Sequence, residues 1–221
     1  MFNFFEKTDT KIQEDVLNEL QWDPSVTASA VTVSANNGIV TLRGSVPHYI
    51  EKMAAEHAAQ RVGGVKAVAD ELEVNFMTPP DHNDEEIAQA ALNAFKWNYS
   101  VPDSVKIAVE KGWVTLSGEV EWDYQRNAAR NTASEILGVC GVTNSINIKS
   151  KVQPSNIKTR IEEALKRSAE SEGRKINVSV SGDHVTLPGN VHSFSEIEDA
   201  RLAAFNAPGV MSVDNNLIIS Q

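Results

Sequence analysis

Apolar side chains return in the same order three times along the chain, and each time they outline two helices and three strands. In the first helix of each repeat an apolar side chain stands at every fourth position, which places these side chains on one helix face. The three sets are Ile12, Val16 and Leu20; Ile87, Ala91 and Phe95; and Ile157, Ile161 and Leu165. Thr10 with Gln13, and Asn83 with Glu86, are typical of N-terminal helix caps. We therefore expect each repeat to open with an amphipathic helix.

Two strands follow this helix, because apolar and polar residues alternate there. In the first repeat Val31 and Val33 alternate with polar residues up to Asn36-Asn37-Gly38, a sequence typical of a tight hairpin turn. The corresponding turns in the other repeats are Glu110-Lys111-Gly112 and Ser181-Gly182-Asp183.

A second helix, rich in alanine, comes next and precedes a last strand. Its alanines recur at every fourth position, so we expect this helix to approach the sheet closely. They are Ala55 and Ala59, Ala129 and Ala133, and Ala200 and Ala204. In the third repeat Ser193 and Glu196 indicate a capping box at the start of this helix. The last strands are predicted over residues 68–76, 142–148 and 213–219.

Three landmarks keep a constant spacing between the repeats. The motif V-T-L-x-G-x-V, a later Gly-Val step and an Asp or Asn all recur at separations of 74 and 71 residues. Their positions are Gly44, Gly118 and Gly189; Gly64, Gly138 and Gly209; and Asp70, Asn144 and Asn215. We interpret the six glycines as structural, since glycine permits turn conformations and a close approach of helix and sheet.

This spacing predicts three tandem modules, at residues 8–76, 83–149 and 154–220, each with the element order αββαβ. We expect an α+β fold in which each module has a small three-stranded mixed sheet and two helices packed on one face. The joints at residues 77–82 and 150–154 are short and contain proline, so we expect semi-rigid spacers.

Each repeat resembles the BON domain of the OsmY-like family in its G-x-V-T-L-x-G-x-V motif, its Gly-Val step and its closing V-x-D/N-x-L/I strand. The resemblance implies a non-enzymatic bacterial protein of osmotic stress and the cell envelope that contacts phospholipid membrane surfaces. It also implies two alternatives, a chaperone-like or protein-interaction scaffold and a small-ligand or potassium sensor. The third module departs from the pattern at Asp183 and Pro188. Because proline has no amide donor, Pro188 predicts an edge strand or a bulged strand.

The chain has 20 basic and 30 acidic residues and a formal net charge of −10. This charge argues against nucleic acid as a partner, because backbone phosphates must be met by lysine and arginine, and against simple electrostatic docking on anionic lipid. No apolar stretch approaches the roughly 20 residues of a transmembrane helix. Residues 1–9 lack the basic segment and cleavage site of a signal peptide, which predicts a cytoplasmic protein. The resemblance makes the periplasm the alternative compartment.

Residue types that carry chemistry in enzymes are not grouped in this sequence. The five histidines show no metal-ligand spacing on one helix face, and Ser193 has no His–Asp relay. No glycine-rich loop of the kind that binds phosphate precedes a helix. Cys140 is the single cysteine, which excludes an intramolecular disulfide. We therefore expect no catalytic residues, no metal site and no cofactor.

Differences between the modules mark the candidate contact surfaces. Trp113 and Trp122 have no counterparts in the other modules, and they indicate either a membrane or protein contact or packing between modules. Trp22 and Trp97 repeat at the end of the first helix, which predicts that each covers its own core. Basic residues of the third module indicate either a site for an anionic surface or a solvated helix face. They are Lys158, Lys166, Arg167, Arg174 and Lys175.

Overall fold

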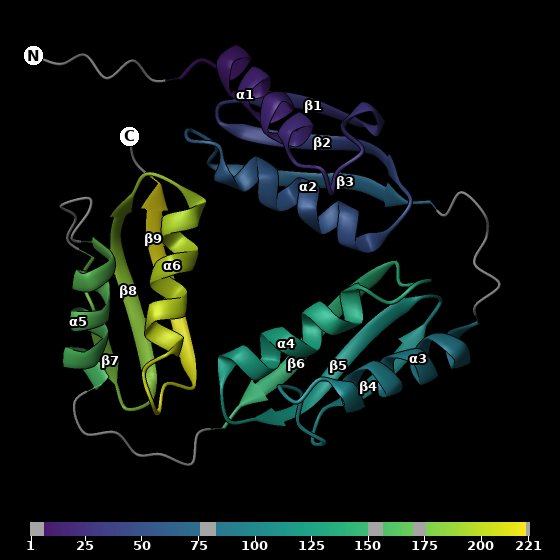
Figure 1. The fold of residues 1–221 in the computed structure, drawn as a ribbon. Helices are drawn as coiled ribbons and strands as arrows, with labels where there is room; N and C mark the ends of the chain where they lie inside the picture. The colour runs from purple at the N-terminus through teal and green to yellow at the C-terminus, as the bar shows by residue number, and fades with distance from the viewer. Residues whose placement is uncertain (1–6, 76–82, 150–156, 170–175, 220–221) are drawn as a thin grey trace, which may run out of the picture.

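The computed structural model describes residues 7–75, 83–149, 157–169 and 176–219, without the side chains of residues 165–169. The protein contains three copies of one αββαβ unit, each with its own three-stranded sheet (Figure 1). The predicted α+β fold of three tandem modules is thereby confirmed. The predicted joints and the apolar side chain of Leu165 lie outside the described residues.

The first module shows how the unit is built. Its elements are α1 (Asp9–Trp22), one turn of 3-10 helix (Ala28–Ala30), β1 (Val31–Asn36), β2 (Ile39–Val46), α2 (Tyr49–Arg61) and β3 (Ala67–Val74). The sheet has the order β1-β2-β3, with β1 antiparallel and β3 parallel to the central β2. Helix α2 is the crossover connection that a parallel strand pair requires.

The second and third modules repeat this topology. The second consists of α3 (Asp84–Trp97), β4 (Lys106–Glu110), β5 (Trp113–Val120), α4 (Asp123–Ser134) and β6 (Gly141–Ile148). The third consists of α5 (Ile157–Ala169), β7 (Ser179–Ser181), β8 (His184–Val191), α6 (Phe194–Phe205) and β9 (Ser212–Ile219). Their sheets have the orders β4-β5-β6 and β7-β8-β9, again with one antiparallel and one parallel pair.

The hydrophobic cores follow the alternation of the strands. In the first module Val40 and Leu42 of β2 are fully buried and pack with Val16 and Leu20 of α1. The predicted alanines of the second helices are at most 1% exposed, which confirms the close approach of helix and sheet. The first module has a core of its own, whereas the cores of the second and third modules form one continuous cluster. The second and third modules are therefore packed against each other.

A carboxylate from the first helix holds the hairpin turn in the first two modules. Asp9 accepts hydrogen bonds from the amides of Gly38 (2.9 Å) and Asn37 (2.8 Å), and these bonds hold the pKa of Asp9 below its ordinary value. Asp84 accepts the same two bonds from residues 111–112, at 2.7 and 2.8 Å. Asn37 and Gly38 have φ angles of 52° and 79°, which confirms the predicted tight turn.

The helix caps agree with the prediction in the second and third modules and differ in the first. Asn83 and Ser193 each accept a hydrogen bond from the amide three residues later, at 3.0 and 3.3 Å. The predicted cap Thr10 lies inside α1, and the N-cap is Thr8, whose side chain accepts from the amide of Lys11. The prediction for Thr10 was wrong because the Thr-x-x-Gln pattern does not report the backbone conformation, and it is Thr8 that has the extended backbone of a cap.

The prediction of an edge or bulged strand at Pro188 was wrong. Pro188 lies in β8, the central strand of its sheet, opposite Asn216 of β9. The antiparallel neighbour β7 ends its pairing with Ser179 opposite Thr186, and beyond it the amide of Asn177 still donates to the carbonyl of Pro188 (3.2 Å) while Pro188 has no amide to donate in return. The missing amide is therefore accommodated by a shorter neighbouring strand.

The first landmark glycine stands where two backbone segments come together. Gly44 has a φ of 136°, and a Cβ atom there would lie 2.0 Å from the carbonyl oxygen of Ala30. Gly118 repeats the arrangement with a φ of 121° and 2.3 Å to the carbonyl oxygen of Ser104. Real Cβ atoms do not approach backbone oxygens so closely, and the positive φ is strained for any other residue.

Candidate functional site

The second helices of the three modules converge in the middle of the molecule. Helices α2, α4 and α6 face one another there (Figure 1), and together they line an open cavity of about 800 Å³. One helix position contributes a charged side chain to this cavity in every module, namely Glu56, Arg130 and Arg201. The repeat thus places equivalent residues around a common centre.

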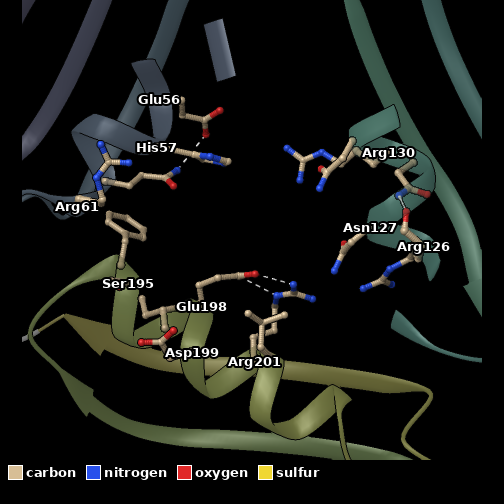
Figure 2. A pocket seen from close by; sticks show the side chains of 16 residues that line it. Glu56, His57, Arg61, Arg126, Asn127, Arg130, Ser195, Glu198, Asp199 and Arg201 are labelled. Carbon is tan, nitrogen blue, oxygen red and sulfur yellow. Dashed lines mark hydrogen bonds and ion pairs between the residues drawn. The ribbon is translucent and has the colours of Figure 1, made fainter. Parts of the chain in front are cut away.

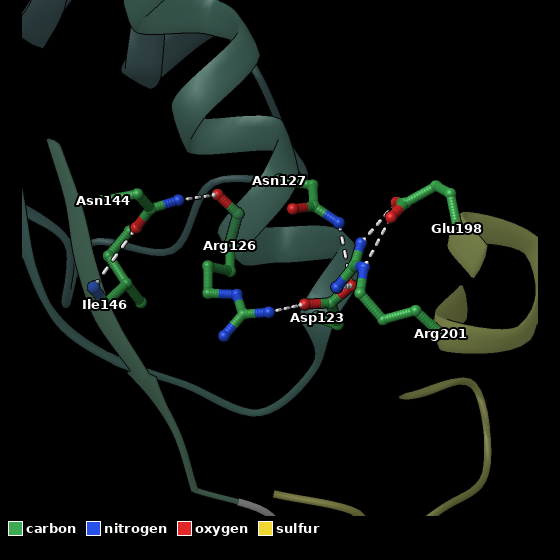
Figure 3. A network of polar contacts seen from close by, with 7 residues as sticks. All are labelled: Asp123, Arg126, Asn127, Asn144, Ile146, Glu198 and Arg201. Atoms are coloured by element: carbon green, nitrogen blue, oxygen red, sulfur yellow. Dashed lines mark hydrogen bonds and ion pairs between the residues drawn. The ribbon is translucent and has the colours of Figure 1, made fainter. Parts of the chain in front are cut away.

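Asp123, the first residue of α4, joins the second module to the third. Its side chain is 3% exposed and accepts hydrogen bonds from Asn127 (2.8 Å), Arg201 of α6 (3.3 Å) and Arg126 (Figure 3). Arg201 also binds both carboxylate oxygens of Glu198, at 2.8 and 2.6 Å, and this pairing lowers the pKa of Glu198. The guanidinium group of Arg201 is therefore held by carboxylates on both sides of the module boundary.

An aromatic ring completes this boundary. The guanidinium carbons of Arg126 and Arg201 lie 4.9 and 5.2 Å from the ring centre of Phe205, within the range of a cation–π contact. Arg126 belongs to the second module and Phe205 to the third, so this contact also crosses the boundary.

The first module is attached through positions equivalent to Asp123. Phe194 of α6 packs against the core of the first module, and Tyr49 of α2 packs against the combined core of the second and third modules. Tyr49, Asp123 and Phe194 are all first residues of second helices. The same repeat position therefore makes a contact between modules in each copy.

The third landmark of the repeat ties each second helix to the last strand. Asn144 donates to the carbonyl of Arg126 (3.0 Å) and accepts from the amide of Ile146 (3.2 Å). Asn215 makes the same two bonds in the third module. In the first module Asp70 forms an ion pair with Lys52, which occupies the repeat position of Arg126 (3.3 Å). The constant spacing of Asp70, Asn144 and Asn215 is therefore explained by one contact, in which each residue joins the second helix of its module to the last strand.

A model of the BON domain matches the chain three times, at residues 8–75, 83–150 and 154–221. The chain belongs to the BON-domain family. This membership supports a non-enzymatic role associated with stress and the cell envelope. None of the curated proteins compared with the chain matches it.

Two solved structures of CdsD, a structural protein of the type III secretion system of Chlamydia trachomatis, also match the BON-domain chain. One is 18% identical, with 92% of this chain and 90% of that chain covered and a TM-score of 0.25. The other, the C-terminal domain of CdsD, is 17% identical, with 97% and 100% covered and a TM-score of 0.27. Both TM-scores are low.

The two module-specific tryptophans lie at different places in the second BON domain. Trp113 stands on the open face of the sheet, is 51% exposed, and donates from its indole nitrogen to Thr143 (2.8 Å). Trp122 is the N-cap residue of α4 and is partly buried. Trp113 is thus available for a contact outside its domain but is also fixed by its own sheet.

Lys158 is the only member of the predicted basic group whose side chain is described. It is exposed on α5, with its ammonium 3.8 Å from Glu162. The side chains of Lys166 and Arg167 and the whole of Arg174 and Lys175 lie outside the described residues. The basic face of the third BON domain therefore stays a prediction.

The prediction that Trp22 and Trp97 cover their own cores was wrong. The two side chains are 86% and 91% exposed, and nearby Tyr99 is 98% exposed. Each tryptophan follows the last buried helix residue, Leu20 or Phe95, by two positions. Two positions correspond to about 200° around a helix, so the tryptophan points away from the core. Sequence repetition reflected position on the helix rather than burial.

A polar group on the open face of the third sheet was not foreseen. His184 lies within hydrogen-bond distance of Ser212 (Nδ1 to Oγ, 2.5 Å) and Asp214 (Nε2 to Oδ2, 2.8 Å). Asp214 is 60% exposed, whereas the carboxylate of a catalytic relay is buried and orients the imidazole. We interpret the group as a cross-strand polar contact between β8 and β9.

Other candidate chemistry is limited in the part of the chain that the structure describes. No three His, Cys, Asp or Glu side chains there are grouped so that they could hold a metal ion. Burial raises the pKa of the Cys140 thiol, which makes it a poor nucleophile. No helix among the described residues has the length and apolar character needed to cross a membrane.

Proposed function

We propose that this BON-domain protein is a non-enzymatic binding protein that contacts phospholipid surfaces through aromatic side chains at the ends of α1 and α3. The supporting observation is the near-complete exposure of Trp22, Trp97 and Tyr99. Tryptophan and tyrosine have an apolar ring and a polar group, so they favour the boundary between lipid headgroups and acyl chains. Trp97 and Tyr99 are exposed only two residues apart, and neighbouring exposed aromatic side chains favour a contact surface more than a single one does.

The charges of the protein suggest how this contact is made. The whole chain carries a net charge of −10, so it gains little from long-range attraction to anionic lipid. Lys96 is exposed directly before Trp97 and supplies a local cation beside the aromatic pair. The contact therefore rests mainly on ring insertion, and we expect it to depend only weakly on salt.

Replacing Trp97 and Tyr99 together by serine is expected to weaken binding to phosphatidylcholine–phosphatidylglycerol vesicles about a hundredfold. Each ring that leaves the lipid boundary loses about 1.5 kcal/mol or more, which is about a factor of ten in affinity. Vesicle co-sedimentation of the full chain measures the loss. Trp22→Ser tests the equivalent side chain in the first BON domain.

Ile218→Ser is the matched control, because Ile218 is 65% exposed on the third sheet and lies outside the proposed surface. This variant should bind like the unaltered protein. Two further variants test the surfaces that the sequence suggested: Trp113→Ser, and the double variant Lys158→Gln with Arg174→Gln. If only these variants lose vesicle binding, the assignment of the contact to α1 and α3 is refuted. Absence of vesicle binding by the unaltered protein at low salt would refute phospholipid contact altogether.

A further inference from the structure

We propose that the cavity between α2, α4 and α6 binds a small molecule that carries a phosphate group. This site is separate from the proposed membrane contact and goes beyond it. Its lining comes from all three BON domains, so the site exists only when the three are assembled.

The cavity is richer in cations than the rest of this acidic protein. Four arginines line it, against three carboxylates. The arginines are Arg61, Arg126, Arg130 and Arg201, and the carboxylates are Glu56, Glu198 and Asp199. Arg61, Arg126 and Arg201 are paired with carboxylates outside the lining, so Arg130 is the cation of the lining that is available to a ligand.

Most of these charged groups already have partners. Arg61 is held by Glu19 and Asp23 at 3.0 and 3.1 Å, outside the cavity lining. Arg201 is held by Glu198, and Glu56 accepts a hydrogen bond from Gln60 (3.0 Å). Glu198 is therefore neutralised by an ion pair, whereas the amide of Gln60 leaves the negative charge of Glu56 in place.

Arg130 is different. Within the described ranges its guanidinium makes no hydrogen bond or ion pair, although the side chain is partly buried. Arg130 extends into the cavity toward the imidazole of His57, which reaches in from α2 on the opposite side (Figure 2). The bond to Arg201 lowers the pKa of Glu198, and the nearby charge of Arg130 adds to this, so Glu198 is a carboxylate neighbour of Arg130 that is bonded to Arg201 instead. A bound anion between Arg130 and His57 would give this partly desolvated guanidinium a directly bonded counter-ion.

The donors around this point suit a phosphate group. A guanidinium offers two parallel N–H donors that match two phosphate oxygens, and imidazole offers a further nitrogen. Asn127 and Asn131 of α4 add amide donors to the lining. The remaining carboxylates favour a ligand that carries hydroxyl or amine donors beside its phosphate. A volume of about 800 Å³ fits a molecule of metabolite size.

The proposal is tested on the full chain by isothermal titration with inorganic phosphate, pyrophosphate and glycerol 3-phosphate at constant ionic strength in potassium chloride. We expect saturable binding of at least one of these probes and a rise in the midpoint of thermal unfolding, because the probe binds only the assembled protein. Arg130→Gln should weaken this binding at least tenfold, and His57→Gln should weaken it as well.

Arg160→Gln is the matched control, because Arg160 is exposed on α5 and its replacement changes the net charge equally. This variant should bind the probe like the unaltered protein. Equal weakening by Arg130→Gln and Arg160→Gln would overturn the proposal, since it would indicate non-specific attraction. No saturable binding of any of the three probes would also overturn it. Loss of vesicle binding in the Trp97 variant without loss of probe binding would show that the two sites are independent.

Discussion

Replacing Gly44 by alanine is expected to unfold the first BON domain at temperatures where the rest of the protein stays folded. The added Cβ would lie 2.0 Å from the carbonyl oxygen of Ala30, so β2 or the 3-10 turn must move. We expect a loss of more than about 4 kcal/mol in the free energy of unfolding, which is a large part of the stability of so small a domain. Calorimetry should show the transition of the first domain separated and lowered, because its core is distinct.

Gly63→Ala provides the control in the same domain. The contact within 4 Å of a Cβ atom at Gly63 is with the flexible end of Lys7, at 3.8 Å, and Gly63 does not have a positive φ. This variant should leave the unfolding transition within about 1 kcal/mol of its original position. Equal destabilisation by the two substitutions would contradict the role assigned to Gly44.

Replacing Asp123 by alanine is expected to uncouple the second and third BON domains. The substitution removes a 3% exposed carboxylate and leaves Arg126 and Arg201 without the partner that they share. Breaking a buried ion pair on one side costs about 3 kcal/mol or more, because the remaining charge stays partly desolvated. We expect the common unfolding transition of these two domains to split into two in calorimetry.

A double-mutant cycle with Arg201→Leu distinguishes this coupling from a general loss of stability. The double variant should be less destabilised than the sum of the single variants, by at least about 1 kcal/mol. Glu119→Ala is the comparison for an exposed pair, because Glu119 and its partner Lys149 are 58% and 68% exposed. Its removal should cost less than about 1 kcal/mol. Additive effects of Asp123→Ala and Arg201→Leu would contradict a shared contact.

Much of each domain follows from local sequence patterns. The order of elements, the hairpin turns and the close packing of the second helices depend on residues near one another in the chain. The errors have local causes too. Thr10 with Gln13 fits a capping box although Thr8 is the cap, and the pattern at Pro188 does not reveal how far its neighbouring strand extends. Trp22 and Trp97 occupy the same helix position, and both are exposed. A residue that recurs in the repeat shows that a helix position is shared, but it does not show whether that position is buried.

The central cavity was not predictable in the same way. Arg130 and His57 lie in different domains, and no spacing along the chain indicates that they face one another. Asp123 stands where the other domains have Tyr49 and Phe194, which was the one available sign of a special contact. The side chain of Asp123 bonds to Arg201, which lies 78 residues later in the chain, so the local sequence does not indicate this contact. Contacts between domains are set by their packing, and periodicity within one domain does not indicate which residues of another domain it faces.

Small-angle X-ray scattering of the full chain tests whether the three BON domains assemble around α2, α4 and α6. We expect the measured curve to coincide with the curve calculated from the assembled structure, and to keep this form at high salt because the domain contacts include buried groups. A larger radius of gyration, with a scattering curve typical of three domains that move independently on linkers, would contradict the assembly and the cavity that depends on it.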